Sequence, residues 1–168
     1  MNNKTINELF QNAKSDPDLV SAINIDDLMD AIENEKNAHL DDKTLSDIAD
    51  DKYKQLKKLN LGKDELKTMF SKLSEYRYID EIHQIHKGKH IRWIRTSSTH
   101  KKVSTYSLTT GGIVVDVKFL DTGTHIMTLT KNPKIPCIQY KFDECITFQK
   151  LSPDEQLILA AYEYIQNT

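Results

Sequence analysis

Apolar residues in the first 75 positions recur every three or four residues, with polar residues between them. This spacing sets apolar side chains on one face of a helix, and the segment holds one glycine (Gly62) and one proline (Pro17). Helix starts are indicated at Thr5, where Glu8 completes a capping box, and at Asp16, which precedes the proline. The pattern predicts about four or five short helices, whose apolar stripes include Leu28, Met29 and Ile32, then Leu45, Ile48, Ala49, Tyr53, Leu56 and Leu59.

After residue 85 the apolar spacing changes to every second residue, which is typical of half-buried β-strands. Asp121-Thr122-Gly123 and Asp143-Glu144 are short links that favour antiparallel hairpins, and Gly111-Gly112 permits a sharp bend. The segment is therefore predicted to form a small antiparallel β-barrel, of the SH3-like type rather than the OB-like type because of its length. The alternating positions are Ile91/Trp93, Ile113/Val115/Val117/Phe119, Ile138/Tyr140/Phe142 and Ile146/Phe148.

The four residues Ser152-Pro153-Asp154-Glu155 form the strongest helix-start signal of the chain. We expect the helix that follows to cover the open end of the barrel, because Leu157, Ile158, Ala161, Tyr164 and Ile165 form one apolar stripe. The fold class is thus α+β, with a helical module over residues 1–75 and a small barrel with a C-terminal capping helix over residues 76–168.

Charge is distributed unevenly along a chain whose net charge is only −2 over 168 residues. Residues 1–75 hold 16 acidic and 11 basic side chains, whereas residues 76–168 hold 9 and 12. Residues 77–102 carry seven Lys and Arg against two acids, and with them four of the six histidines. This segment is the positive pole of the molecule.

The stretch GKHIRWIR, residues 88–95, combines that charge with a strand-like pattern. In a strand beginning at His90, Ile91 and Trp93 share one face, while His90 and Arg92 project from the other. The adjacent loop TSSTHKK, residues 96–102, adds hydroxyl groups and two lysines. Such donors suit phosphate oxygens, so we expect contact with a DNA or RNA backbone through Lys87, Lys89, Arg92, Arg95, Lys101 and Lys102. Trp93 is the remaining candidate nucleic-acid-binding residue.

Other interpretations of this stretch stay open. The basic strand is equally consistent with an ordinary solvated face, or with a face that docks on the acidic helical half. Trp93 is either a core residue or a platform on which a base stacks.

Neither an enzyme nor a cofactor or metal site is predicted. The sequence holds no P-loop, dinucleotide-binding glycine pattern, nucleophile elbow, kinase signature or HExxH. His83, His86 and His90 lack a Cys or carboxylate spaced to complete a zinc site. The Asp pairs lack the spacing and central glycine of a calcium loop.

Cys137 and Cys145 are the only cysteines, and we expect them to be reduced core thiols. The first residues lack the apolar run of a signal peptide, and no segment is apolar over the length of a membrane span. The expected location is cytoplasmic, with no membrane partner.

Four segments of the C-terminal half, GKHIRWIR, LTTGGIVVDVKF, IQYKFDECITFQKLS and PDEQLILAAYEYI, resemble uncharacterised conserved proteins of nucleocytoplasmic large DNA viruses. Their layout also resembles SH3-like barrels of chromatin-, RNA- and ribosome-associated proteins. The viral resemblance implies action in the cytoplasm of an infected cell, in a viral factory or in a virion. It carries over no binding residue.

A second hypothesis makes the helical half the working surface of a protein-interaction or assembly component. The stripe of Leu28, Met29 and Ile32 lies beside Asp26, Asp27 and Asp30. Such a face could dock on a partner or self-associate, or it could simply pack within the chain.

Overall fold

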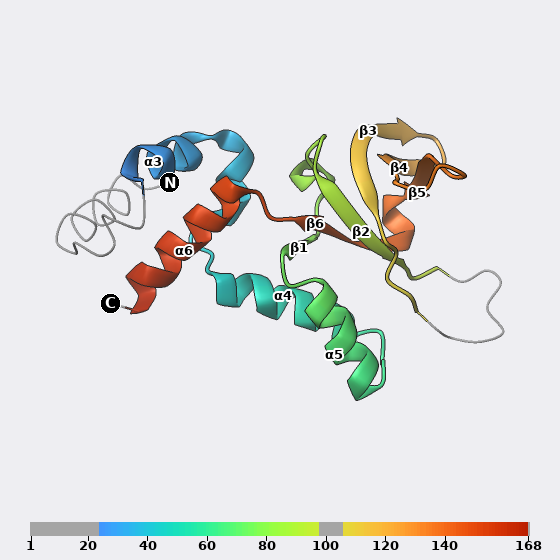
Figure 1. Cartoon of the computed structure of the whole chain (residues 1–168), viewed down its shortest axis with the longest axis horizontal. Coiled ribbons are helices and arrows are strands. Elements are labelled where there is room, and N and C mark those ends of the chain that lie inside the picture. The colour runs from blue at the N-terminus through green and yellow to red at the C-terminus, as the bar shows by residue number, and fades with distance from the viewer. Residues whose placement is uncertain (1–23, 98–105, 168) are drawn as a thin grey trace. The chain divides into compact units, whose positions relative to one another are not determined.

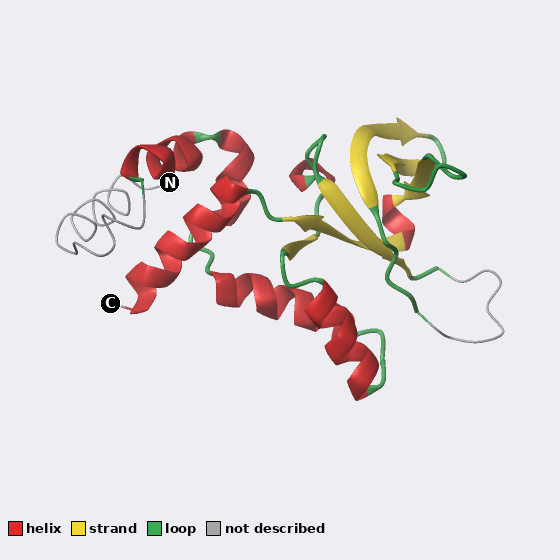
Figure 2. Ribbon diagram, viewed as in Figure 1, coloured by secondary structure: helices red, strands yellow, loops and turns green. Residues whose placement is uncertain are grey.

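The structure is a computed structural model that describes residues 24–97 and 106–167 (Figure 1). The helix starts predicted at Thr5 and Asp16 lie outside these residues. The chain divides into two compact units. One, here called the terminal unit, combines residues up to Ile48 with those from Leu151 onward, and the other, the central unit, is Ala49–Lys150. All strands among the described residues belong to the central unit (Figure 2).

The terminal unit contains the helices α3 (Ile25–Glu33) and α6 (Pro153–Asn167) and the 3₁₀ helix η1 (Glu35–Leu40). α3 begins where the Asn24 side chain accepts hydrogen bonds from two backbone N–H groups of the first turn. The capping box predicted for α6 is confirmed, since the N–H of Ser152 donates to Glu155 Oε2 at 2.8 Å and the N–H of Glu155 donates to Ser152 Oγ at 3.2 Å.

α6 packs against α3 and η1, so its apolar stripe is used within the terminal unit. The sequence pattern instead predicts a helix that covers the open end of the barrel. The buried core of the terminal unit also draws on Leu40 and Ile48, and the predicted boundary at residue 75 does not coincide with the observed division. A local apolar pattern predicts that a helix packs against another segment, but it does not predict which distant segment that is.

The central unit combines two helices with a six-stranded antiparallel sheet, of strand order β1-β6-β2-β3-β4-β5. The helices are α4 (Leu45–Lys57), whose first turn lies in the terminal unit, and α5 (Lys63–Lys72). The strands are β1 (Tyr76–Ile79), β2 (His90–Arg95), β3 (Gly112–Leu120), β4 (Gly123–Leu129), β5 (Cys137–Lys141) and β6 (Cys145–Lys150). Short 3₁₀ helices η2 (Ile82–Gln84) and η3 (Phe142–Glu144) precede β2 and β6.

The sheet is open, because its edge strands β1 and β5 do not pair with each other. The α+β class is confirmed, but the closed barrel that we expected is not formed. The hairpin predicted at Asp121-Thr122-Gly123 joins β3 to β4. The hairpin predicted at Asp143-Glu144 is absent, because η3 carries the chain from β5 across to β6, which pairs with β1 and β2.

A stack of two aromatic rings shows how strongly the sheet curls. Trp93 lies on β2 and Tyr140 on β5, three strand spacings apart, which would be about 14 Å in a flat sheet. Their ring centroids are only 4.2 Å apart, with an interplanar angle of 14°. The Tyr140 hydroxyl also lies 3.0 Å from Thr147 Oγ1 of β6. The inner face of the sheet, which carries these rings, is therefore wrapped around its own core.

The opposite, outer face is partly covered by α4 and α5. Leu56 and Leu73 of the helical segment pack with Ile94 and Phe148 of the sheet. Lys52 is buried here, and its Nζ donates to the carbonyl oxygens of Leu73 at 2.8 Å and of the next residue at 3.3 Å. Burial lowers the pKa of Lys52. The ammonium satisfies carbonyls at the C-terminus of α5, where a cation is favourable.

Replacing Trp93 by alanine is expected to lower the free energy of unfolding by about 3–5 kcal/mol, because it empties the centre of the inner core. Tyr140→Phe keeps the ring and removes only its hydroxyl contact, so a loss of about 1 kcal/mol is expected. Urea unfolding followed by circular dichroism measures both losses. A loss for Trp93→Ala no larger than that for Tyr140→Phe would contradict the role of the stack.

Candidate nucleic-acid interface

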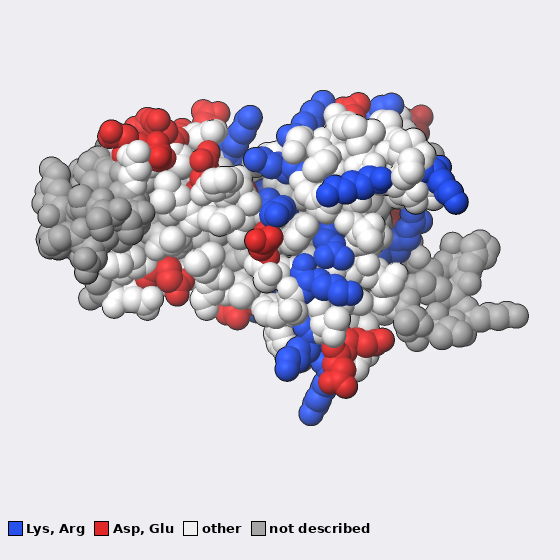
Figure 3. Space-filling model, in the orientation of Figure 1, with Lys and Arg blue, Asp and Glu red and all other residues white. Residues whose placement is uncertain are grey.

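The division into units sharpens the charge asymmetry of the chain. The central unit holds 19 Lys and Arg against 11 Asp and Glu, a net charge of +8. The rest of the chain holds 4 against 14, a net charge of −10. On the face shown in Figure 3, basic side chains gather over the sheet and acidic ones over α3. A boundary at residue 75 hides this contrast, because the lysine-rich helices α4 and α5 pack with the sheet.

A row of side chains crosses the outer face at the end of the sheet where β2 begins. The strand register pairs Tyr76 of β1 with Lys150 of β6, and His90 of β2 with Ile113 of β3. Leu129 of β4 continues the row as the partner of Ile113. The Tyr76 hydroxyl lies 3.0 Å from His90 Nδ1. The row therefore combines polar and cationic groups with two exposed aliphatic side chains.

His90 is half-buried among cations. Burial first, and then the charges of Arg92, Lys150 and Lys131, lower the pKa of His90 from its ordinary value of 6.5. Lys150 is itself paired with Glu75 at 3.2 Å. In the neutral ring, the Tyr76 hydroxyl can donate to Nδ1, which leaves the ring proton on Nε2. An anion bound beside this ring would favour its protonated form and raise the pKa of His90.

The predicted site residues divide between several places. Lys87 forms an ion pair with Asp116 at 3.0 Å, although its side chain is 67% exposed. The guanidinium of Arg92 is partly used within the fold, since it donates to the carbonyl oxygens of Thr109 at 2.8 Å and Lys72 at 3.3 Å.

Lys89 is half-buried just before β2, and Arg95 is exposed at the other end of this strand. The six residue steps from Lys89 to Arg95 span about 20 Å of strand. The two lysines predicted in the loop, Lys101 and Lys102, lie outside the described residues.

Trp93 is a core residue and not a stacking platform. Only 1% of it is exposed, and its ring is covered by Tyr140. Alternation alone could not decide this, because both faces of β2 are partly covered and the partner ring comes from β5. The large exposed apolar side chains of the described sheet are instead Ile113, Phe119, Leu120 and Leu129.

A groove opens next to His90 at the end of the row. It has a volume of about 500 Å³ and is bounded by residues before and at the start of β3 and by the loop between β4 and β5. Its lining residues include Thr110, Ile113, Lys131, Asn132 and Ile135.

The sequence prediction missed this groove. It also missed Lys131 and Lys150, the two lysines whose charges lower the pKa of His90. The only signal of the groove in the sequence was the pair Gly111-Gly112, which we interpreted as a bend.

The histidine cluster does not form a metal site. Within residues 24–97 and 106–167 no group of three His, Cys, Asp or Glu side chains is placed to hold a metal ion. His83 Nδ1 lies 3.1 Å from a carboxylate oxygen of Glu81, whereas His90 contacts Tyr76.

The two cysteines differ from each other. Cys137 is exposed, which corrects the expectation of a core thiol, because it lies on the outer face of the edge strand opposite Leu129. Cys145 is half-buried, and burial raises the pKa of its thiol to about 11.

Comparison of the chain with protein-family models, curated proteins and solved structures finds no match in any of the three. Among the described helices, none combines the length and the apolar character that crossing a membrane requires.

The pKa of His90 is expected to lie below 6.5 when its Cε1 proton is titrated by NMR, and to rise in Lys150→Gln, which removes one of the cations that lower it. The unfolded chain binds more protons than the folded one between the lowered pKa and 6.5. The His90 contribution to stability is therefore present above 6.5 and is lost as the pH falls through this window. Lys134→Gln, an exposed lysine not among those cations, serves as the control, and equal shifts in both variants would contradict the assignment.

Proposed function

We propose that the protein binds DNA or RNA without enzymatic activity, through phosphate contacts to the outer face and the ends of β2 in the central unit. The observation that carries this proposal is the net charge of +8 on that unit, with Lys131 and Lys150 gathered around His90. Phosphate contacts of this kind supply affinity without sequence specificity.

The spacing of the basic side chains supports contact with an extended backbone. The distance of about 20 Å from Lys89 to Arg95 spans about six base-pair steps along the axis of a duplex, so more than one phosphate lies within it. The ion pair of Lys87 with Asp116 is exposed, and such pairs contribute little to stability, so Lys87 can exchange its partner for a phosphate.

The relationship of the sheet to SH3-like barrels is part of the same proposal. Strands β2 to β5 follow one another in the sheet, and β6 returns to pair with β2 after a 3₁₀ turn. We interpret this arrangement as an SH3-like barrel that is open between β1 and β5. The cytoplasmic location, and the viral factory or virion that the resemblance implies, belong to this proposal as well.

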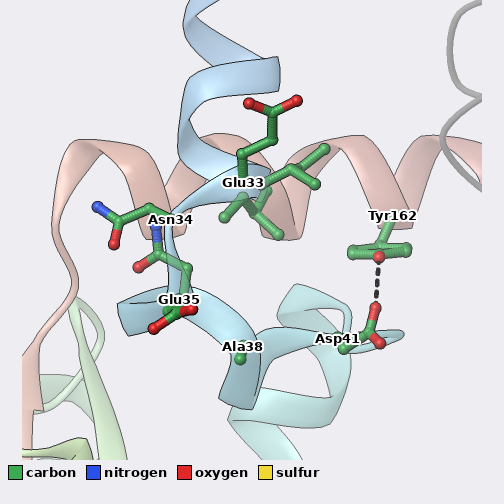
Figure 4. A pocket seen from close by; sticks show the side chains of 9 residues that line it. Glu33, Asn34, Glu35, Ala38, Asp41 and Tyr162 are labelled. Atoms are coloured by element: carbon green, nitrogen blue, oxygen red, sulfur yellow. Dashed lines mark hydrogen bonds between the residues drawn. The ribbon is translucent and has the colours of Figure 1, made fainter. Parts of the chain in front are cut away.

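A groove in the terminal unit supports a second candidate function, protein interaction or assembly. The groove, of about 290 Å³, has Ile32, Ala38 and Ile158 among its apolar lining residues. Figure 4 shows Glu33 and Glu35 around it and the hydroxyl of Tyr162 directed at Asp41, to which it donates at 2.9 Å. An acidic rim around an apolar floor fits a partner segment in which Lys or Arg flanks apolar side chains. The central unit of a second copy carries the complementary charge.

Fluorescence anisotropy of labelled DNA and RNA against the full chain is expected to show binding at about 50 mM salt that weakens steeply by 200 mM. Lys89→Gln and Arg95→Gln should each reduce the slope of log affinity against log salt by about 0.7–0.9, the value for one phosphate contact. Lys36→Gln, an exposed lysine of the terminal unit, should leave it unchanged. Absence of binding at low salt, or a slope that none of these changes alters, would refute the proposal.

If the second candidate holds through self-association, the mass from light scattering should rise with concentration at low salt. Glu33→Lys should abolish the rise, because Glu33 lines the groove, whereas Asp30→Lys, one turn earlier on the same helix, should not. A constant monomer mass at every concentration would count against self-association.

A further inference from the structure

The groove beside His90 offers more than backbone contact. It is built from three separate segments: His90 at the start of β2, residues 110–113 leading into β3, and residues 130–138 around the loop from β4 to β5. Its volume of about 500 Å³ lies within the range of about 300–1,000 Å³ found for small-molecule sites. A pocket of this size holds one small organic group with its phosphate and not a length of duplex.

Two glycines allow the strands at this end of the sheet to approach one another closely. Gly111 has a φ of +78°, and a Cβ there would lie 1.9 Å from the carbonyl oxygen of Ile91 and 2.9 Å from His90 Cε1. A Cβ on Gly112 would lie 2.5 Å from the carbonyl oxygen of Leu129. The absence of both side chains lets β2, β3 and β4 approach and leaves no side chain from residues 111 and 112 to fill the groove.

The groove is cationic at the side of His90. Lys131 and His90 both line it, and Lys150 and Arg92 add positive charge close to the imidazole. With its Nδ1 beside the Tyr76 hydroxyl, the neutral imidazole has Nε2–H as a second hydrogen-bonding group. A phosphate placed here would meet both a charge and a hydrogen-bond donor.

The remaining lining includes three isoleucines and is held in shape. Ile113 and Ile135 are 39% and 52% exposed and line the groove, so both offer apolar surface to a bound group. The loop that carries Ile135 is fixed by its own hydrogen bonds, since the N–H of Asn132 donates to Thr130 Oγ1 at 3.2 Å and the N–H of Lys134 donates to Asn132 Oδ1 at 3.0 Å. A loop ordered in this way loses less entropy when a ligand binds.

We propose that this groove is a subsite for one unstacked nucleotide of a single strand, with its phosphate at His90 and Lys131 and its base against Ile113 and Ile135. The inference rests on the proposed function and adds to it a preference for single strands over duplexes. In a duplex the bases are stacked and paired, so only a single strand or a splayed end presents a base and its phosphate together. The protein should therefore bind single strands more tightly than duplexes.

Proton uptake accompanies such binding. A phosphate beside His90 favours the imidazolium and raises its pKa, against the lowering effect of burial and of Arg92, Lys131 and Lys150. Two further titratable groups lie close to it: the Tyr76 hydroxyl, which contacts the ring, and Glu75, which pairs with Lys150. Affinity should thus increase as the pH falls through the interval between the pKa values of the free and bound states.

Anisotropy of one labelled sequence, presented as a single strand and as a duplex, tests the subsite in the full chain. The double variant Lys131→Gln with Ile135→Ser is expected to weaken single-strand binding about tenfold and duplex binding less than threefold, as the loss of one base contact and one phosphate contact. The matched control, Lys118→Gln with Leu120→Ser at the exposed far end of β3, should change both less than threefold. Equal losses for both forms of nucleic acid, or none, would overturn the subsite.

NMR separates this inference from the proposed function. Adenosine 5′-monophosphate should shift the His90 Cε1 proton and the Ile135 methyl signals, whereas inorganic phosphate should shift only His90. Salt-dependent binding of oligonucleotides without any shift by the mononucleotide would overturn the subsite and leave backbone binding intact. Shifts by the mononucleotide without oligonucleotide binding would support the subsite and overturn the proposed function.

Discussion

The stack of Trp93 on Tyr140 is the contact on which the central unit depends. It joins β2 to β5 across the inner face, and it requires a curl that brings strands three positions apart into contact. Once the inner face is wrapped around this pair, the side chains on the other side of the same strands must face outward. His90 and Arg92 are displayed because Ile91 and Trp93 are buried. The chemistry of the outer face is thus a consequence of how the inner core is filled.

Much of the secondary structure could be predicted from the sequence, because it rests on local patterns. The start of α6 and the link between β3 and β4 were predicted correctly from capping and turn residues. The alternation expected along β3 was wrong in detail, because a bulge between Val114 and Asp116 shifts the register, so that Val114 is buried and Ile113 is exposed. β1 was missed because it is four residues long and includes the buried Arg77. Partner choice, as for α6, depends on segments far away in the chain.

The candidate site was predictable only as a region. The density of Lys and Arg near β2 pointed to the surface that carries the candidate site, because charge can be counted without knowing the fold. The grouping around His90 was not predictable, because Lys150 arrives through the pairing of β6 and Lys131 through a loop after β4. Trp93 was assigned to the site for its chemistry, yet its burial follows from Tyr140, 47 positions later in the sequence.

An open sheet keeps two edge strands that a closed barrel would not have, and exposed strand edges are templates for aggregation. The edges here are short, four residues in β1 and five in β5. β5 follows directly on Pro136, which has no N–H to offer, and ends at Lys141, a charged residue of the kind that disfavours strand addition. The chain can therefore leave its sheet open without presenting a long, flat edge on which further molecules could stack as fibrils.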